Sequence, residues 1–161
     1  IKILDLSFNN IREIEGLGFL KNLKTIYLLS NRISKIKGLS SMHSIEEIEL
    51  GSNKISVIEN LFDLPSLRTL ILAKNKIEII SNLEPIQHIT TLNLSCNNIE
   101  SIYGLEKLTQ LKELYLAENY IQQIENLENN GKLVLLDLSY NKIKEIKGLE
   151  NMSMLEDLWV R

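Results

Sequence analysis

The chain has 161 residues, a net charge of −3 and a hydrophobic content of 44%, which is enough apolar material to fill a core. Because the net charge is mild, a strongly charged surface must come from segregation of charged residues. The single cysteine, Cys96, excludes an internal disulfide framework and favours a reducing compartment. No apolar run approaches the ~20 residues that a membrane span needs, so we expect no membrane association.

An asparagine recurs every 22 residues along the whole chain. It occupies the ninth place of the pattern L-x-x-L-x-L-x-x-N-x-I, which is clearest over residues 133–143. A fixed period of this length with this pattern is the signature of a leucine-rich-repeat solenoid. The asparagines are Asn9, Asn31, Asn53, Asn75, Asn97, Asn119 and Asn141.

We therefore predict an α/β solenoid, a leucine-rich-repeat horseshoe with a parallel β-sheet on its concave face. Residues 1–161 form one domain of seven full repeats and the first seven residues of an eighth. Since the chain begins directly on a repeat and stops inside one, we expect it to be a fragment that lacks terminal caps.

Within each repeat, numbered from place 1 to place 22, the first element is a short strand around places 4 and 6. These places are Leu, Ile or Val throughout and alternate with other residues, as expected for a strand with one buried face. Place 11 (Ile11 to Ile143), place 14 (Ile14 to Ile146) and place 17 are isoleucine or leucine in every full repeat. We predict that stacked coils bury all of these columns.

The rest of the repeat turns the chain back across the convex side. Place 16 is always Gly or Asn, the residues that adopt positive φ most easily, so a left-handed turn is expected there. Places 17 to 22 are predicted to form a short helical or 3₁₀ turn. The asparagine at place 9 is interpreted as structural, because its amide can bond the backbone of its own and the adjacent coil.

The strand residues that point outward, at places 3, 5 and 7, differ from repeat to repeat. Places 3 and 5 together hold six carboxylates, three large aromatic residues and no lysine or arginine. Place 7 is mostly small, which would let a partner approach the sheet. Exposed aromatic residues flanked by acids are typical of protein-binding hot spots. Place 5 reads Asp5, Tyr27, Glu49, Ile71, Asn93, Tyr115, Asp137 and Trp159.

Catalytic and ligand-binding chemistry has little support in the sequence. His43 and His88 have no acid or nucleophile nearby in the repeat, and we expect both on the convex surface. No Cys/His cluster has metal-ligand spacing, and no glycine-rich phosphate loop occurs. An acidic face also disfavours nucleic acid, which binds basic surfaces. We expect no enzymatic activity, cofactor, metal or small-molecule substrate.

The chain resembles the leucine-rich-repeat regulatory subunits of protein phosphatase 1 over all its repeats. The resemblance includes details outside the repeat consensus, at residues 49–53, 124–130 and 158–159. It implies that a place-5 row of acids and aromatic residues holds the phosphatase catalytic subunit. Tyr27 and Asp157 stand where the family tends to have Phe and Glu, and Ile71 replaces an aromatic residue. We therefore expect partner contacts from Asp5, Tyr27, Glu49, Ile71, Tyr115, Asp137, Asp157 and Trp159.

The resemblance implies a non-enzymatic regulator, located in the nucleus or the cytoplasm, that docks a basic patch of the catalytic subunit. Two alternatives stay open. One is a scaffold of another intracellular assembly, axonemal or splicing. The other is a secreted bacterial adhesin with 22-residue repeats, which would require a signal peptide or an anchoring segment upstream.

Overall fold

The computed structural model describes residues 1–40 and 42–161, and over these residues it is a stack of coils on one parallel sheet. The described chain forms eight strands of three residues each. They are β1 (Ile3–Asp5), β2 (Thr25–Tyr27), β3 (Glu47–Glu49), β4 (Thr69–Ile71), β5 (Thr91–Asn93), β6 (Glu113–Tyr115), β7 (Leu135–Asp137) and β8 (Asp157–Trp159).

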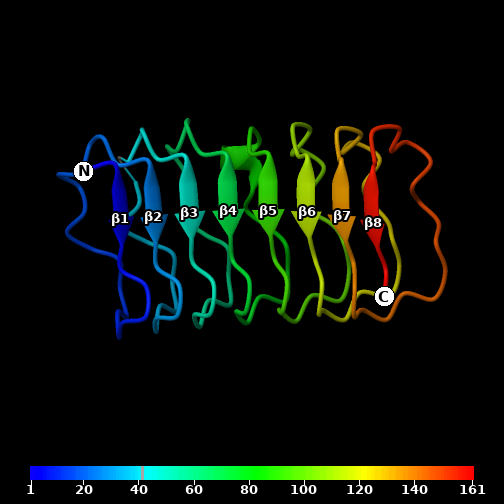
Figure 1. Ribbon diagram of the computed structural model, residues 1–161, viewed down its shortest axis with the longest axis horizontal. Coiled ribbons are helices and arrows are strands. Elements are labelled where there is room, and N and C mark those ends of the chain that lie inside the picture. The colour runs from blue at the N-terminus through cyan, green and yellow to red at the C-terminus, as the bar shows by residue number, and fades with distance from the viewer. Residues whose placement is uncertain (41) are drawn as a thin grey trace.

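The strands follow one another across the sheet in chain order, and each pairs in parallel with the next. The register advances by one full repeat, so that Leu4 faces Ile26 and Leu136 faces Leu158. Figure 1 shows the eight arrows side by side and pointing the same way, with the N-terminus near β1 and the C-terminus near β8. Equivalent places of all repeats therefore form straight rows across the sheet.

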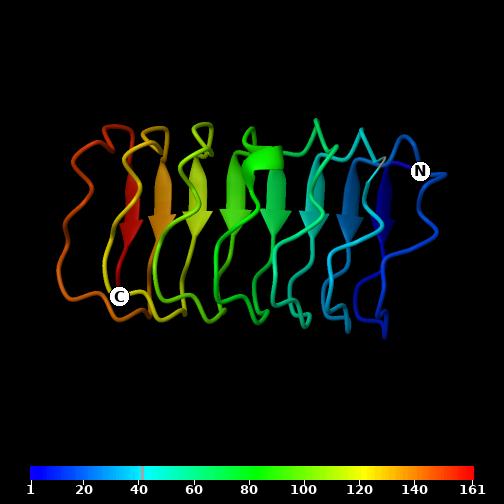
Figure 2. The same cartoon turned by 180° about the vertical axis from the view of Figure 1, so that it is seen from behind.

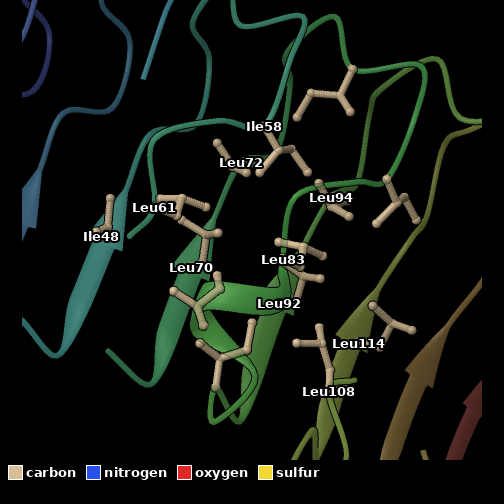
Figure 3. Close-up of a cluster of buried hydrophobic side chains, with 14 of the residues drawn as sticks. Ile48, Ile58, Leu61, Leu70, Leu72, Leu83, Leu92, Leu94, Leu108 and Leu114 are labelled. Carbon is tan, nitrogen blue, oxygen red and sulfur yellow. The ribbon is translucent and has the colours of Figure 1, made fainter. Parts of the chain in front are cut away.

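The core lies between the sheet and the returning loops, which Figure 2 shows from behind. The middle residue of every strand from β2 to β7 is buried, and its two neighbours are half-buried on the other face. Place 6 is buried from Leu28 to Leu138. Figure 3 shows side chains from the strands, such as Leu70 and Leu92, packed against others from the returning loops, such as Leu61 and Leu83.

The predicted left-handed turn at place 16 is confirmed in all seven repeats, with φ between 57° and 77° from Gly16 to Gly148. A Cβ atom on Gly38 would lie 1.9 Å from the carbonyl oxygen of Ile14, so this glycine is required. Where Asn replaces glycine, its amide bonds the preceding coil, as Asn60 does to the Ile36 carbonyl at 2.7 Å. The sequence did not predict a second positive φ at place 8, which runs from Phe8 to Tyr140.

Among the described residues, the convex side holds almost no helix. A 3₁₀ helix, η1 (Glu84–Ile86), forms in one repeat, where Pro85 fits its first turn. In the other described repeats the same stretch makes isolated turns closed by backbone bonds over three residues, as from Leu108 to Leu105 at 2.9 Å. The predicted short turn is therefore found, as a 3₁₀ helix in one repeat and as single turns in the other described repeats. Places 17 to 22 hold too few residues for a longer helix.

The asparagine column ties adjacent coils together, as predicted. Asn97 Nδ2 donates to the carbonyls of Leu72 and Leu94, at 3.0 and 2.9 Å, and its Oδ1 accepts the N–H of Ile77 at 2.9 Å. Each bond of this kind satisfies a backbone group where the chain turns off the strand. The amide thereby links its own coil to the preceding one.

The predicted core column at place 14 is wrong in one repeat, at Ile146. This side chain is 56% exposed, whereas Ile58, Ile80 and their equivalents are fully buried. In the described chain the coil that contains Ile146 has a neighbour on one side only, so no later coil covers it.

Candidate protein-binding surface on the concave sheet

All eight predicted contact residues lie on the outward face of the sheet. Seven of them occupy place 5, the last residue of each strand, and Asp157 occupies place 3 of β8. Asp5, Asp157 and Trp159 are exposed, the last by 42%, and the other five are half-buried. We call the place-5 residues from Asp5 to Trp159 the concave row.

The concave row alternates strictly between two kinds of residue. Polar side chains stand in β1, β3, β5 and β7, and apolar or aromatic side chains stand in β2, β4, β6 and β8. Since neighbouring strands lie about 4.8 Å apart, residues of one kind recur about every 10 Å. Each carboxylate of the concave row therefore has an aromatic or aliphatic side chain beside it.

Every polar member of the concave row accepts a hydrogen bond from the backbone N–H two residues later. Asp5 and Asp137 bond the N–H of Ser7 and Ser139 at 2.9 Å. Asn93 bonds Ser95 at 3.0 Å and Glu49 bonds Gly51 at 2.5 Å. Among the described residues, the place-7 N–H groups that follow the apolar members carry no such cap.

This local bond gives the acids a structural role that the sequence analysis missed. A signal for it exists, because place 7 is Ser or Gly after every polar member and Leu, Ala or Arg after every apolar one. The bond lowers the pKa of Asp5, since the Ser7 N–H stabilises its carboxylate. The backbone N–H thereby holds the side-chain oxygen of each polar member in place.

Three of the six acids at places 3 and 5 lie in β6 to β8, at the C-terminal end of the sheet. In the strand register Asp137 lies between Tyr115 and Trp159. Burial raises the pKa of the Tyr115 phenol, and the carboxylates of Glu113, Asp137 and Asp157 raise it further. The Tyr115 hydroxyl donates to Glu113 at 3.2 Å. Tyr115 thus stands in a cluster of three acids.

A hollow of about 380 Å³ opens beside this cluster. Asp137 and Trp159 line it together with Glu118, Tyr140 and Arg161. The last three were not among the predicted contacts, which were all taken from places 3 and 5. Arg161 puts one positive charge at the rim of a surface that is otherwise acidic and aromatic.

Glu49 is a half-buried acid of the concave row. Burial raises the pKa of its carboxyl, the hydrogen bond from Gly51 opposes this rise, and the nearby Glu47 carboxylate adds to it. The two acids occupy places 3 and 5 of one strand, β3. A cationic group of a partner would relieve their repulsion.

The histidines lie on the convex side, as expected, but one has an acid partner that the repeat pattern concealed. His43 Nε2 is 2.7 Å from Asp63 Oδ2, which belongs to the following coil. Both side chains are exposed. Within the described part of the chain, no three His, Cys, Asp or Glu residues are grouped so that they could hold a metal. Among the same residues, no helix has the length and apolar character of a membrane span.

A stack of coils that presents a continuous open sheet defines a repeat scaffold suited to protein–protein interaction. Family comparison agrees with this class. The family model described as "Leucine Rich repeats (2 copies)" matches residues 1–41 and 87–129. The model described as "Leucine rich repeat" matches residues 23–77. The first covers more than half of the chain, which therefore belongs to the leucine-rich-repeat family.

Solved structures show the same fold. An internalin (inlF) from Listeria monocytogenes is 30% identical with a TM-score of 0.83, over 98% of this chain but only 47% of its own length. Internalin C2 from the same organism is 25% identical with a TM-score of 0.78, over 100% of this chain and 81% of its own. TLR13 in complex with ssRNA13 shares the fold, with 23% identity and a TM-score of 0.87. The match covers 97% of this chain and 25% of the TLR13 chain. No curated protein matches the chain.

Proposed function

We propose that the chain is a non-enzymatic regulator of protein phosphatase 1, whose concave row docks a basic patch of the catalytic subunit. Docking would control the activity, assembly or location of the phosphatase, in the nucleus, the cytoplasm or both. The observation that carries the binding surface is the exposed face of acids and aromatic rings without lysine or arginine at places 3 and 5.

The physical argument for a basic protein partner has two parts. Carboxylates held on a rigid sheet steer a positively charged surface and fix its orientation. Aromatic side chains between them supply apolar contact area, which dominates binding energy at hot spots. An eight-stranded sheet is roughly 34 Å wide at about 4.8 Å per strand interval, so it accommodates a folded domain.

The identity of the partner is supported by the sequence resemblance alone. The solved structures described above are two internalins and a complex of TLR13 with ssRNA13, and they support only the scaffold. The phosphatase proposal therefore needs a direct test with the purified catalytic subunit.

The test is surface plasmon resonance between the immobilised chain and the purified catalytic subunit, at low and high salt. We expect saturable binding whose association rate falls as salt rises, because screening weakens long-range attraction between opposite charges. Glu128→Lys, on the exposed convex side, is the control and should bind as the parent does. Absence of binding would refute the partner, and a salt-independent rate would refute the electrostatic role of the face.

A second candidate is a bacterial protein-binding domain. The observation that favours it is the 30% identity with an internalin from Listeria monocytogenes over 98% of this chain. Reading the complete open reading frame discriminates between the two candidates. A signal peptide or anchoring segment upstream would favour the bacterial alternative.

A further inference from the structure

A second set of residues that depart from the repeat lies on the flank of the solenoid, where the chain leaves the sheet. Place 10 is Asn, Lys or Arg in every full repeat except one, where it is Tyr120. Place 15 is polar or charged except at Tyr103. Place 13 is polar or charged except at Val57 and Ile79. The four exceptions fall in four consecutive repeats, and the last three of these repeats hold Ile79, Tyr103 and Tyr120.

The same three side chains converge on one pocket of about 650 Å³. Ile79, Tyr103 and Tyr120 are 53%, 38% and 44% exposed, so they add little to the core. The core of these coils is formed instead by isoleucines such as Ile80 and Ile102, which are fully buried. Apolar side chains gathered on a surface without a packing role mark an interaction site. We call this hollow the flank pocket.

The polar residues of the flank pocket define the ligand chemistry. Glu78 and Glu100, at place 12 of adjacent repeats, line it, and neither forms a salt bridge within the described residues. Lys142 also lines the pocket, with Nζ 4.7 Å from the centre of the Tyr120 ring. The pocket thus already holds one cation against an aromatic ring and keeps two carboxylates free.

We propose that the flank pocket binds an arginine side chain of a partner protein. A guanidinium group is planar, stacks on aromatic rings and pairs with a carboxylate through two parallel hydrogen bonds. The flank pocket offers both kinds of group, together with the aliphatic surface of Ile79 for the methylene stem. An acidic ligand such as a phosphate would meet Glu78 and Glu100 and be repelled.

This surface is distinct from the concave row. Places 10 to 15 follow the turn off the sheet, whereas the concave row ends at place 5. The inference therefore does not depend on protein phosphatase 1 or on the concave face. A partner could occupy the two surfaces together, or two partners could occupy one each.

The test uses the whole chain carrying Asp137→Asn, which weakens competing binding of cations at the concave face. Acetyl-Gly-Arg-Gly-amide and its citrulline counterpart are titrated while NMR follows the ring resonances of Tyr103 and Tyr120. We expect saturable shifts with the arginine peptide and a dissociation constant about fivefold lower than with citrulline, the gain of one exposed charge pair. Absence of saturable shifts, or equal binding of both peptides, would overturn the proposal.

Neutralising variants identify the groups responsible. Glu78→Gln and Glu100→Gln should each raise the dissociation constant of the arginine peptide about two- to fivefold. Tyr103→Leu should raise it by a similar factor, because the ring is lost and an apolar side chain remains. Glu128→Gln, which is exposed but remote from the flank pocket, is the control. An equal effect of this control would show that only net charge matters and would overturn the site.

Discussion

The Oδ1 oxygen of Asp137 accepts a hydrogen bond from the backbone N–H of Ser139, over 2.9 Å. The second carboxylate oxygen makes no hydrogen bond among the described residues. Asn93 forms the equivalent bond to Ser95 with an amide oxygen, over 3.0 Å. The backbone cap therefore needs an oxygen at this position, whereas attraction of a basic partner needs the charge.

These two roles of Asp137 can be separated by two substitutions. Asp137→Asn keeps the cap and should leave the free energy of unfolding unchanged, while Asp137→Ala should lower it by about 1 kcal/mol. Both should weaken binding of the phosphatase catalytic subunit, because both remove the charge. Urea unfolding and plasmon resonance measure the two effects. Asn93→Ala, which removes a cap without removing a charge, is the matched control for stability.

The Asp137 series has a clear contrary outcome. If Asp137→Asn binds the catalytic subunit as tightly as the parent chain, the acid serves the fold alone. The function of the carboxylates in the concave row would then be to accept hydrogen bonds from the place-7 N–H groups.

Trp159 is expected to be a binding hot spot. It is 42% exposed and lies beside Asp137 in the strand register. Both residues line the hollow of about 380 Å³ described above. Trp159→Ala should weaken binding of the catalytic subunit by about 2 kcal/mol or more and should change the free energy of unfolding little. Calorimetric titration measures this loss. Phe62→Ala is the control, because Phe62 is 53% exposed on the convex side; a similar loss there would argue against a specific site.

Most of the fold could be predicted because the repeat samples each structural position seven times. The alternating columns at places 4 and 6 gave the strands, and the Gly or Asn column at place 16 gave the left-handed turn. The positive φ at place 8 had no such signal. Residues as different as Phe8, Lys74, Cys96 and Glu118 adopt it. There the backbone geometry of the coil overrides the preference of the side chain.

The candidate surfaces were only partly visible in the sequence. Comparison of the strand columns identified the concave row, because departures from the repeat stand out within one column. The flank pocket draws Ile79, Tyr103 and Tyr120 from three different columns, so their convergence appears only in three dimensions. The cap of Asp137 left a signal in the sequence, because Ser or Gly follows every polar member at place 7, but the signal was not recognised before the backbone bond was seen.

Glu49 predicts a pH dependence of stability. Burial raises the pKa of its carboxyl above the ordinary value of 4.5, so the folded chain binds its proton more tightly than the unfolded chain does. The stabilising contribution of the protonated form is complete below pH 4.5 and is lost as the pH rises through the folded-state pKa. The free energy of unfolding of the parent, relative to Glu49→Gln, should therefore fall over this range.

Urea unfolding of both proteins at a series of pH values measures this difference. Glu47→Gln is the control, because it removes the neighbouring charge and should reduce the dependence without abolishing it. A difference that stays constant with pH, or that grows as the pH rises, would contradict the raised pKa.

Asn97 should contribute more to stability than the equivalent Asn9. Asn97 is 5% exposed, and its amide bonds two carbonyls and the buried Ile77 N–H across two coils. Asn97→Ala should lower the free energy of unfolding by about 3 kcal/mol, because these buried groups lose their partner. Asn9 is exposed, and among the described residues its amide bonds only the carbonyls of Leu6 and Ser7, within its own coil. Asn9→Ala should therefore cost about 1 kcal/mol or less. Urea unfolding compares the two variants, and equal losses would mean that the bonds between coils add nothing to those within one.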